Sequence, residues 1–393
     1  MTHSATLQAA TSQSVLERVN TMVETLRERA RETEVQRGMT PENLKDLTDA
    51  GVFRLTLPQD RGGFEADAAT INEILAQIGR GDPSTAWIAS IMTAMNSWTG
   101  FLADEGADEI LSTADVRITG LIAPTGKAVE VDGGISVSGT WMWNTGGKHS
   151  NWVGLACMQE TDKGRMPVAA LVPTSEVTLH ETWDASGMAG TATNKITCQD
   201  VFVPASRVVP IPSLGSGEFG ERSYSSNPYY NRPAVQLFLV YAAGPILGIA
   251  RGAMDVFMEK LPGKGITYTS YASAAEAPIT HHQLADAQFS LEIAEMYTNR
   301  INELAAASLT RPVTIDDRVR TRAYLGQVAE YSRRCVTTLF QASGASAIQH
   351  SAHIQRYFRD AQSLALHALI QPTSSRELYG RHLAGLEPNT TLL

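Results

Sequence analysis

The sequence predicts an α+β fold in which helices and strands are segregated along the chain, and three observations support this. Apolar residues recur at helical spacing up to about residue 115, and from Val116 their period falls from about 3.6 residues to about 2. After a connection at 210–233 that is rich in Pro, Ser, Gly and Tyr, four helical segments follow. We therefore expect an N-terminal helical domain at 1–115, a middle antiparallel β-domain at 116–210 and a C-terminal four-helix bundle at 211–393.

Composition and charge exclude several classes of protein. The 393 residues are 43% hydrophobic, enough for a sizeable core, and the net charge of −9 argues against a nucleic-acid surface. Three scattered cysteines without a CxxC pair indicate a reducing, cytoplasmic compartment and no metal site. No secretory signal is visible, and the longest apolar run, Ala234–Ala250, is interrupted by Gly244 and Pro245. We expect a buried helix there and no membrane contact.

Start and stop signals place the first helices. Apolar residues recur at helical spacing from Val15 to Leu26, and Thr40 can cap a helix whose first turn holds Pro41. After a helix at about 71–78, Asp82-Pro83 opens a long apolar helix that runs to about Leu102.

Alternation and turns define the β-domain. Val129, Val131, Ile135 and Val137 alternate around Asp132-Gly133-Gly134, a strong hairpin signal. Further short strands are expected at 151–158, 167–172 and 194–203.

The C-terminal helices are expected at about 234–260, 280–308, 314–342 and 351–370. The gap at 261–278 is a long loop, a feature that is often functional. On the last helix, offsets of three and four place five polar residues on one stripe: His353, Arg356, Asp360, Ser363 and His367. For any one of these residues a solvated face is the more common explanation, but the stripe as a whole mixes a cation, an anion and two histidines, which makes it a candidate site.

Residues 139–152 contain three tryptophans, three glycines and a histidine, with little aliphatic content. Tryptophan needs a partner for its indole N–H, and glycine lets the backbone approach a ligand closely. The stretch therefore indicates either one wall of a site for a large flat ligand or a twisted hairpin with aromatic packing.

A second small-residue segment follows the third C-terminal helix, at 340–347. Its exposed amides could hold a phosphate or ribose, or Gly344 could simply end the helix. Motifs of other chemistries, GxSxG, a Walker loop, HExxH and GxGxxG, do not occur, and the adjacent pair His281-His282 is a weak metal signal.

The layout, the tryptophan stretch and the last helix together resemble the acyl-CoA dehydrogenase superfamily, over most of the chain. They resemble more closely its oxygen-using branch, the two-component, reduced-flavin-dependent monooxygenases that include the oxygenase component of 4-hydroxyphenylacetate hydroxylase. That branch shows a Gly-x-Trp-x-x-x-Ser-Gly segment and an Arg-Asp pair followed seven residues later by His. The matching residues here are Gly139, Trp141, Thr145 and Gly146, and then Arg359, Asp360 and His367.

An absence separates the two branches. Acyl-CoA dehydrogenases need a glutamate base, which in many lies eight residues after the Asp of the Arg-Asp pair; here that position is Ala368. In others it lies on the first helix of the C-terminal domain, and here no Asp or Glu occurs between Glu221 and Asp255. Loss of such a base slows the reaction by roughly two to four orders of magnitude. A dehydrogenase acting on an acyl thioester and a non-catalytic flavin-binding protein remain as alternatives.

The resemblance implies an oxygenase that takes reduced flavin, FMN or FAD, from a separate NAD(P)H:flavin reductase. Dioxygen as co-substrate would form a flavin hydroperoxide that oxygenates a small organic substrate, aromatic or nitrogen-containing. It also implies a homotetramer with the flavin at a subunit boundary. The implied catalytic residues are Thr145, which would hydrogen-bond the flavin ring nitrogen, and His367, as the acid–base group.

The remaining implied contacts fall into two sets. The cofactor set is Trp141, Trp143, Asn144, Thr145, Gly146, Gln341, Gly344, Ala345 and Ser346. The substrate set is Trp87, Ile91, Asn96 and His367.

Two departures from the family pattern matter. Thr145 replaces a serine, and Asn96 aligns with a histidine that often contacts the substrate in relatives that hydroxylate phenols, which argues against a simple phenol.

Overall fold

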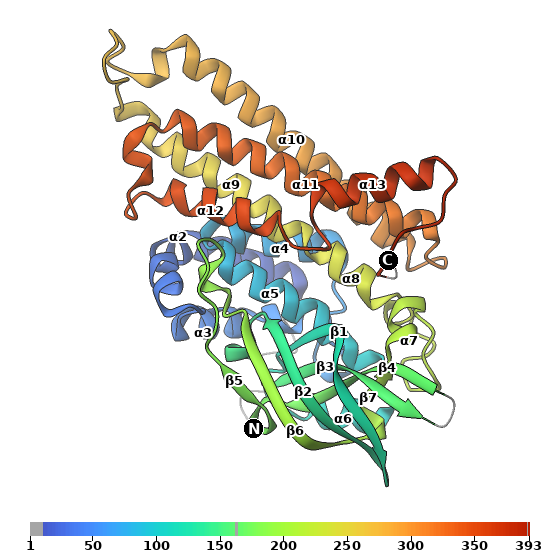
Figure 1. Ribbon diagram of the computed structural model, residues 1–393. Coiled ribbons are helices and arrows are strands. Elements are labelled where there is room, and N and C mark those ends of the chain that lie inside the picture. The colour runs from blue at the N-terminus through green and yellow to red at the C-terminus, as the bar shows by residue number, and fades with distance from the viewer. Residues whose placement is uncertain (1–10, 162–163, 391) are drawn as a thin grey trace.

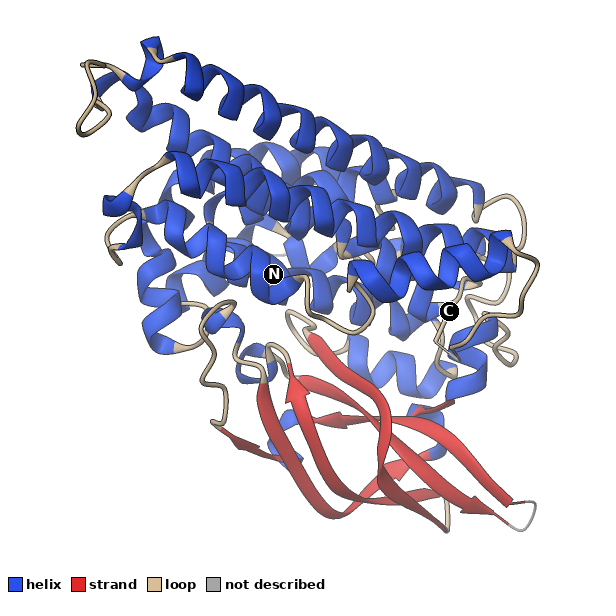
Figure 2. Cartoon of the chain, turned by 45° about the horizontal axis from the view of Figure 1, so that its top comes forward, coloured by secondary structure: helices blue, strands red, loops and turns tan. Residues whose placement is uncertain are grey.

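The computed structural model describes residues 11–161, 164–390 and 392–393. Helices from both ends of the chain form one thick layer, and a single sheet covers one side of it (Figures 1 and 2). The predicted order of helices, strands and helices is confirmed.

The N-terminal helices begin where the sequence signals place them. Thr40 accepts from Asn43 N–H, and Asp82 accepts from Ser84 N–H at the start of the apolar helix. The helices are α2 (Ser12–Gln36), α3 (Pro41–Ala50), α4 (Ala68–Gly81), α5 (Pro83–Asn96) and α6 (Asp104–Leu111). Every residue of α5 is buried, because it lies between the sheet and the C-terminal helices.

Within the described part of the chain, the sheet has seven strands in the order β5-β6-β2-β1-β3-β4-β7. Their bounds are β1 (Ile118–Val131), β2 (Gly134–Asn144), β3 (Trp152–Thr161), β4 (Gly164–Pro173), β5 (Thr178–His180), β6 (Asn194–Pro204) and β7 (Val208–Pro210). The predicted hairpin joins β1 to β2, with Val131 opposite Gly134. The antiparallel prediction is wrong for one pair, because β1 and β3 run parallel.

The C-terminal helices differ from the prediction in the connection, which contains a short helix, and in the first and last predicted helices. They are α7 (Ile211–Ser216), α8 (Ala234–Tyr241), α9 (Ala243–Lys260), α10 (Pro278–Ala307), α11 (Ile315–Ala342), α12 (His353–Leu364) and α13 (Pro372–Leu383). The first predicted helix breaks at Ala242, because Gly244 N–H bonds the side chain of Asn72 and Pro245 has no N–H. The last one ends at Leu364, and tight turns then lead to Pro372, which opens α13.

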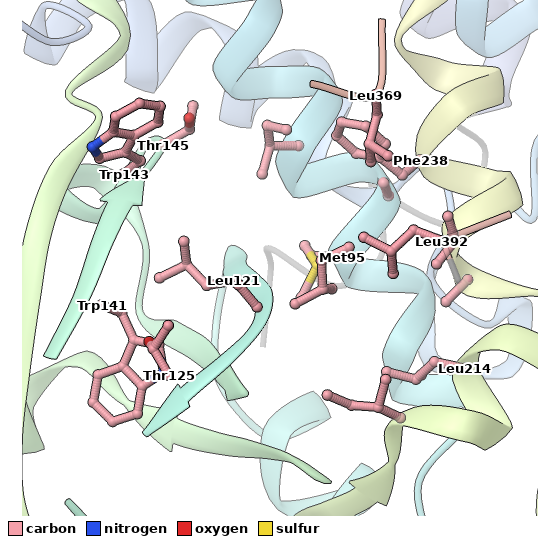
Figure 3. A pocket seen from close by; sticks show the side chains of 18 of the residues that line it. Met95, Leu121, Thr125, Trp141, Trp143, Thr145, Leu214, Phe238, Leu369 and Leu392 are labelled. Carbon is pink, nitrogen blue, oxygen red and sulfur yellow. The ribbon is translucent and has the colours of Figure 1, made fainter. Parts of the chain in front are cut away.

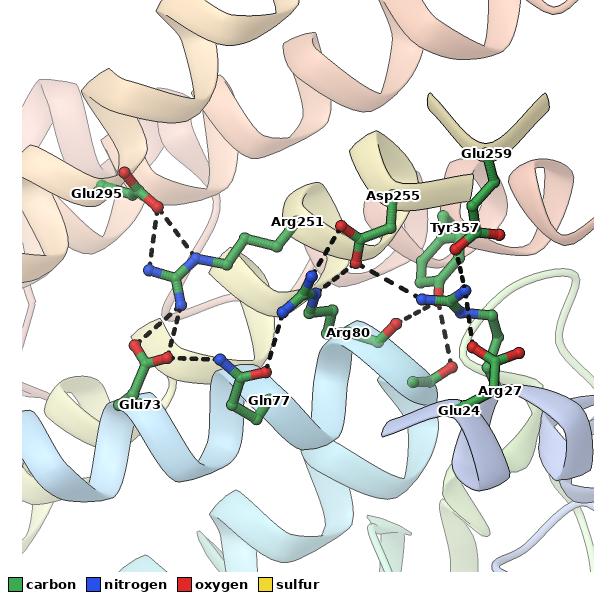
Figure 4. Close-up of polar contacts among 11 residues, drawn as sticks. Glu24, Arg27, Glu73, Gln77, Arg80, Arg251, Asp255, Glu259, Glu295 and Tyr357 are labelled. Carbon is green, nitrogen blue, oxygen red and sulfur yellow. Dashed lines mark hydrogen bonds and ion pairs between the residues drawn. The ribbon is translucent and has the colours of Figure 1, made fainter. Parts of the chain in front are cut away.

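Close packing and ion pairs join α4 to α9 in the core of the helical layer. A Cβ at Gly248 of α9 would lie 2.3 Å from Ala76 O of α4, so the two backbones touch. Arg251 of α9 bridges Glu73 of α4 and Glu295 of α10 (Figure 4). These contacts fix α4, and with it the short connection into α5.

One helical stretch among the described residues, Ala234–Gly263, is long and apolar enough to cross a membrane. Its most apolar window is 83% buried inside the protein, as in the core helix predicted from the sequence. It comprises α8 and α9, and α8 contributes to the cavity described next.

Candidate active site

A cavity of about 430 Å³ lies where the sheet, α5, α8 and the segment after α12 meet (Figure 3). We call its two sides the sheet wall, which includes Thr125, Trp141, Trp143 and Thr145, and the helix wall, which includes Ile91, Phe238, His367 and Leu369. Among the described lining residues there is no Asp, Glu, Lys or Arg. The size and the apolar lining are those of a site for a small organic ligand.

The tryptophan stretch divides between core and cavity. Trp141 is buried, and its indole N–H donates to Ala156 O at 2.7 Å, which meets the partner requirement inside the sheet. Trp143 is 68% exposed and has a φ of +73°, an unusual conformation for a bulky residue. The register between β2 and β6 shifts between Trp141 and Asn144, and this shift turns the Trp143 ring toward the cavity mouth. Trp141 therefore packs in the sheet, both tryptophans line the cavity, and the predicted role of the stretch as a ligand wall stays a prediction.

The residues that follow Trp143 form a tight turn under the sheet wall. Thr145 lines the cavity, and its Oγ1 lies 3.0 Å from Oγ1 of Thr193. Asn144 is fully buried, and its Nδ2 has no hydrogen-bond partner in the part of the chain that the structure describes. Gly146 has a φ of +72°, and its N–H donates to Thr191 O at 3.0 Å. Neither Asn144 nor Gly146 is among the residues that line the cavity, and their predicted contacts with the cofactor stay predictions.

His367 lies in the turn after α12, not on the helix, which corrects the predicted stripe. Its ring packs edge-on against Trp87, with 5.6 Å between centroids, and also contacts Phe238. Leu369 N–H donates to Nδ1 of His367 at 3.3 Å, so the proton of the neutral ring belongs on Nε2.

Burial lowers the pKa of His367 to about 4, and the nearby Arg322 guanidinium contributes in the same direction. The sequence argument that this histidine titrates near neutral pH is therefore wrong for the ligand-free chain. His367 is a neutral hydrogen-bonding group at pH 7.

Two further residues of the predicted stripe lie in the protein interior. Arg356 and Asp360 are buried, so the stripe is not a solvated face, and neither residue lines the cavity. Asp360 Oδ1 accepts Met188 N–H at 2.5 Å. Burial raises the pKa of Asp360 to about 7.

Only some of the predicted substrate-contacting residues line the cavity. Ile91 lines the cavity, whereas Trp87 lies behind His367 and supports its ring. Asn96 is fully buried and does not line the cavity. Its Nδ2 donates to Phe53 O and Val116 O, and its Oδ1 accepts Ile118 N–H. These hydrogen bonds connect α5 to the backbone at Phe53 and around the start of β1, and the predicted contact of Asn96 with the substrate stays a prediction.

The predicted phosphate segment lies at the far end of the bundle. Gln341, Gly344, Ala345 and Ser346 are exposed, and Ser346 lines a second, smaller pocket of about 180 Å³ together with Lys260 and Lys264. That pocket shares no lining residue with the large cavity. One chain therefore does not bring the two parts of the predicted cofactor set together.

Sequence reasoning missed several lining residues. Ile211 and Leu214 come from a connection treated as a loop, although their spacing of three is a weak helical signal. Leu392 comes from the C-terminal tail, which is held by a hydrogen bond from Arg322 to its carbonyl oxygen. No local pattern marks that tail as part of a site. The predicted functional loop at 261–278 lies beside the smaller pocket instead.

Two family models match the chain. Residues 9–110 match "Acyl-CoA dehydrogenase, N-terminal domain", and residues 240–372 match "Acyl-CoA dehydrogenase, C-terminal domain". The matched ranges contain α4, α5, α9, α11 and α12, the helices that hold the helix wall in place.

Similar proteins share both sequence and fold. The flavin-dependent monooxygenase, oxygenase subunit HsaA, of Mycobacterium tuberculosis is 30% identical over 394 residues, covering 98% of this chain and 99% of that protein. The crystal structure of 3-HSA hydroxylase from Rhodococcus sp. RHA1 has a TM-score of 0.90 at 28% identity, covering 97% of this chain and 99% of the other. XiaF from Streptomyces sp., in complex with FADH2 and glycerol, has a TM-score of 0.88 at 25% identity, covering 97% and 98%.

Proposed function

We propose a substrate class and residue roles for this chain, which belongs to the two-component flavin-dependent monooxygenases. It is an oxygenase component that uses dioxygen and reduced flavin, FMN or FAD, from a separate reductase to oxygenate a small organic molecule. The substrate that we propose is an uncharged, mostly apolar aromatic compound. The observation that carries this choice is the uncharged lining of the large cavity, because burying an unpaired ionic group costs several kcal/mol.

The sheet wall fits a flavin ring. Trp143 offers an exposed aromatic face at the mouth, and Thr145 offers a hydroxyl inside it (Figure 3). When bound there, reduced flavin supplies the electrons that activate dioxygen. We propose that Thr145 hydrogen-bonds the flavin ring nitrogen, that Trp143 covers the ring, and that Trp141 and Ile91 help to exclude water.

The helix wall fits the substrate. We propose that His367 contacts its reacting group, with Trp87 and Phe238 holding the imidazole in place. Because Nδ1 of His367 accepts the Leu369 N–H, the proton of the neutral ring is on Nε2, which can donate it in a hydrogen bond to the ligand. A role as proton acceptor at Nε2 would require the other tautomer and loss of the Leu369 contact. No carboxylate lies among the described lining residues, so a dehydrogenase reaction at this cavity lacks a candidate carboxylate base.

The assembly is also part of the proposal. Trp143 is exposed in one chain, and the segment from Gln341 to Ser346 lies far from it. A homotetramer with flavin bound at a subunit boundary would bring such a segment of one subunit to the site of another. Exposed apolar residues on α10, among them Phe289 and Met296, support an interface there. We propose a cytoplasmic tetramer of three-domain chains divided as in the sequence; a monomer in light scattering at micromolar concentration would contradict it.

Paired substrates test the proposed substrate class. Purified protein, a flavin reductase and NAD(P)H are supplied with a phenol that carries an apolar substituent, or with its analogue ending in a carboxylate. We expect kcat/KM to be at least about 100-fold higher for the neutral compound, because the cavity offers the carboxylate no cation. Equal or better turnover of the carboxylate analogue would refute the proposed class.

A further inference from the structure

Three threonine hydroxyls form a chain that leads away from the cavity beneath the sheet wall. Oγ1 of Thr145 lies 3.0 Å from Oγ1 of Thr193, which lies 2.7 Å from Oγ1 of Thr191. Thr191 and Thr193 are buried, and neither lines the cavity. The chain of hydroxyls ends at Met188, whose carbonyl oxygen is 2.8 Å from Oγ1 of Thr191.

Each hydroxyl pair could be oriented either way on its own, and a Thr191 proton on Met188 O sets one direction for both. A carbonyl oxygen cannot donate, so the single hydroxyl proton of Thr191 points to Met188 O. Thr191 then receives the proton of Thr193, and Thr193 receives the proton of Thr145. With its only proton used in this way, Thr145 presents lone pairs to the cavity.

The anchor at Met188 is firmly held. Met188 has a φ of +52°, and its N–H donates to Asp360 Oδ1 at 2.5 Å. Its carbonyl oxygen also accepts the indole N–H of Trp183 at 3.0 Å. Asp360 and Trp183 therefore orient the acceptor from which the direction of the chain is set.

We propose that Thr191 and Thr193 are positioning residues that make Thr145 a pure hydrogen-bond acceptor, and that this makes the site prefer reduced over oxidised flavin. The central ring nitrogen of reduced flavin carries a proton and donates, whereas the same nitrogen of oxidised flavin only accepts. An acceptor at Thr145 matches the first and opposes the second. The inference rests on the proposed contact between Thr145 and that nitrogen.

Binding measurements on Thr193→Val test this. The substitution keeps the shape of the side chain and removes the hydroxyl, which frees the Thr145 proton to turn toward the flavin. The dissociation constant of reduced flavin is measured anaerobically and that of oxidised flavin in air, both without substrate. We expect the ratio of the oxidised to the reduced constant to fall roughly tenfold. The two-electron midpoint potential of the bound flavin should fall by about 30 mV.

Three further variants make the outcome decisive. Thr193→Ser keeps the hydroxyl and should keep the wild-type ratio. Thr191→Val removes the link to Met188 and should lower the ratio if Thr193→Val does not fold. If the ratio changes in Thr145→Val but not in Thr193→Val or Thr191→Val, the inference about the positioning residues is wrong, while the proposed contact between Thr145 and the flavin stands. An unchanged ratio in Thr145→Val overturns the proposed flavin contact as well.

Discussion

The two walls of the cavity hold their polar groups in different ways. On the sheet wall, Thr145 is the last member of a chain of hydrogen bonds that begins at a buried carbonyl oxygen. On the helix wall, His367 is surrounded by Trp87 and Phe238, and burial determines its protonation state. The sheet wall should therefore respond to substitutions outside the cavity, whereas the helix wall should depend on His367 itself.

The largest effect is expected from His367. Removing the ring in His367→Ala should slow oxygen transfer by roughly two to four orders of magnitude, because the substrate loses its only titratable partner among the described lining residues. Reduced flavin should still bind, since its proposed contacts lie on the sheet wall. Rapid-mixing measurement of product formation, with flavin binding measured separately, checks both statements.

His367→Gln is the matched control. Glutamine can place an amide N–H near the position of Nε2, but it cannot accept a proton at neutral pH. If the donor role is right, this variant should recover a large part of the rate lost in His367→Ala. A Gln variant as slow as the Ala variant would instead indicate that His367 acts as a base. Normal product formation in the Ala variant would remove His367 from the mechanism.

Substitution of Asn96 tests whether this residue, which does not line the cavity, contributes to substrate binding. Asn96→Ala leaves the backbone groups of Phe53, Val116 and Ile118 without their side-chain partner. We expect the free energy of unfolding to fall by about 3 kcal/mol or more, with KM for the substrate little changed. Chemical denaturation and steady-state kinetics measure the two. A raised KM with unchanged stability would place Asn96 in the substrate site.

Much of the fold could be predicted because local sequence signals mark where helices begin and where the hairpin turns. Thr40 and Asp82 begin helices at the expected places, and the Asp132-Gly133-Gly134 turn makes the expected hairpin. The parallel pairing of β1 with β3 was missed because strand direction depends on the path of the intervening chain. The end of α12 was missed because helical spacing continues past Leu364 although the backbone does not.

The site was predictable in part. Thr145 and His367 were found because a family pattern marks them, and both line the cavity. Thr191 and Thr193 were not, because a threonine next to a strand is ordinary in sequence and matters here only through Thr145. The low pKa of His367 was equally invisible, since it arises from burial, in which Trp87 and Phe238 take part, and from the charge of Arg322.

Thr145→Ala should have a smaller effect than the loss of His367. Without the hydroxyl, the proton on the flavin ring nitrogen loses its proposed acceptor. A larger share of the dioxygen consumed should then be released as hydrogen peroxide instead of being transferred to the substrate. The expected change is several-fold in peroxide released per NAD(P)H consumed, with folding stability within about 1 kcal/mol of the wild type. Unchanged coupling would remove Thr145 from the flavin site, and with it the chain of threonines.

The last prediction concerns pH and isolates the burial of His367. The pKa of this ring is lowered from 6.5 to about 4, so between these values the unfolded chain binds a proton that the folded chain does not. The contribution of His367 to stability therefore rises as pH increases from about 4 to 6.5 and is constant above. Because glutamine does not titrate, His367→Gln should lose less stability than the wild type on acidification through this range. For the same reason the part of the rate that depends on His367 should be flat between pH 6 and 8. Denaturation midpoints of the two proteins across pH 4 to 7 measure the difference. Parallel curves, or a step in rate near pH 6.5 that disappears in the Gln variant, would show that the ring is solvated, and the contrast between the two walls would then fail.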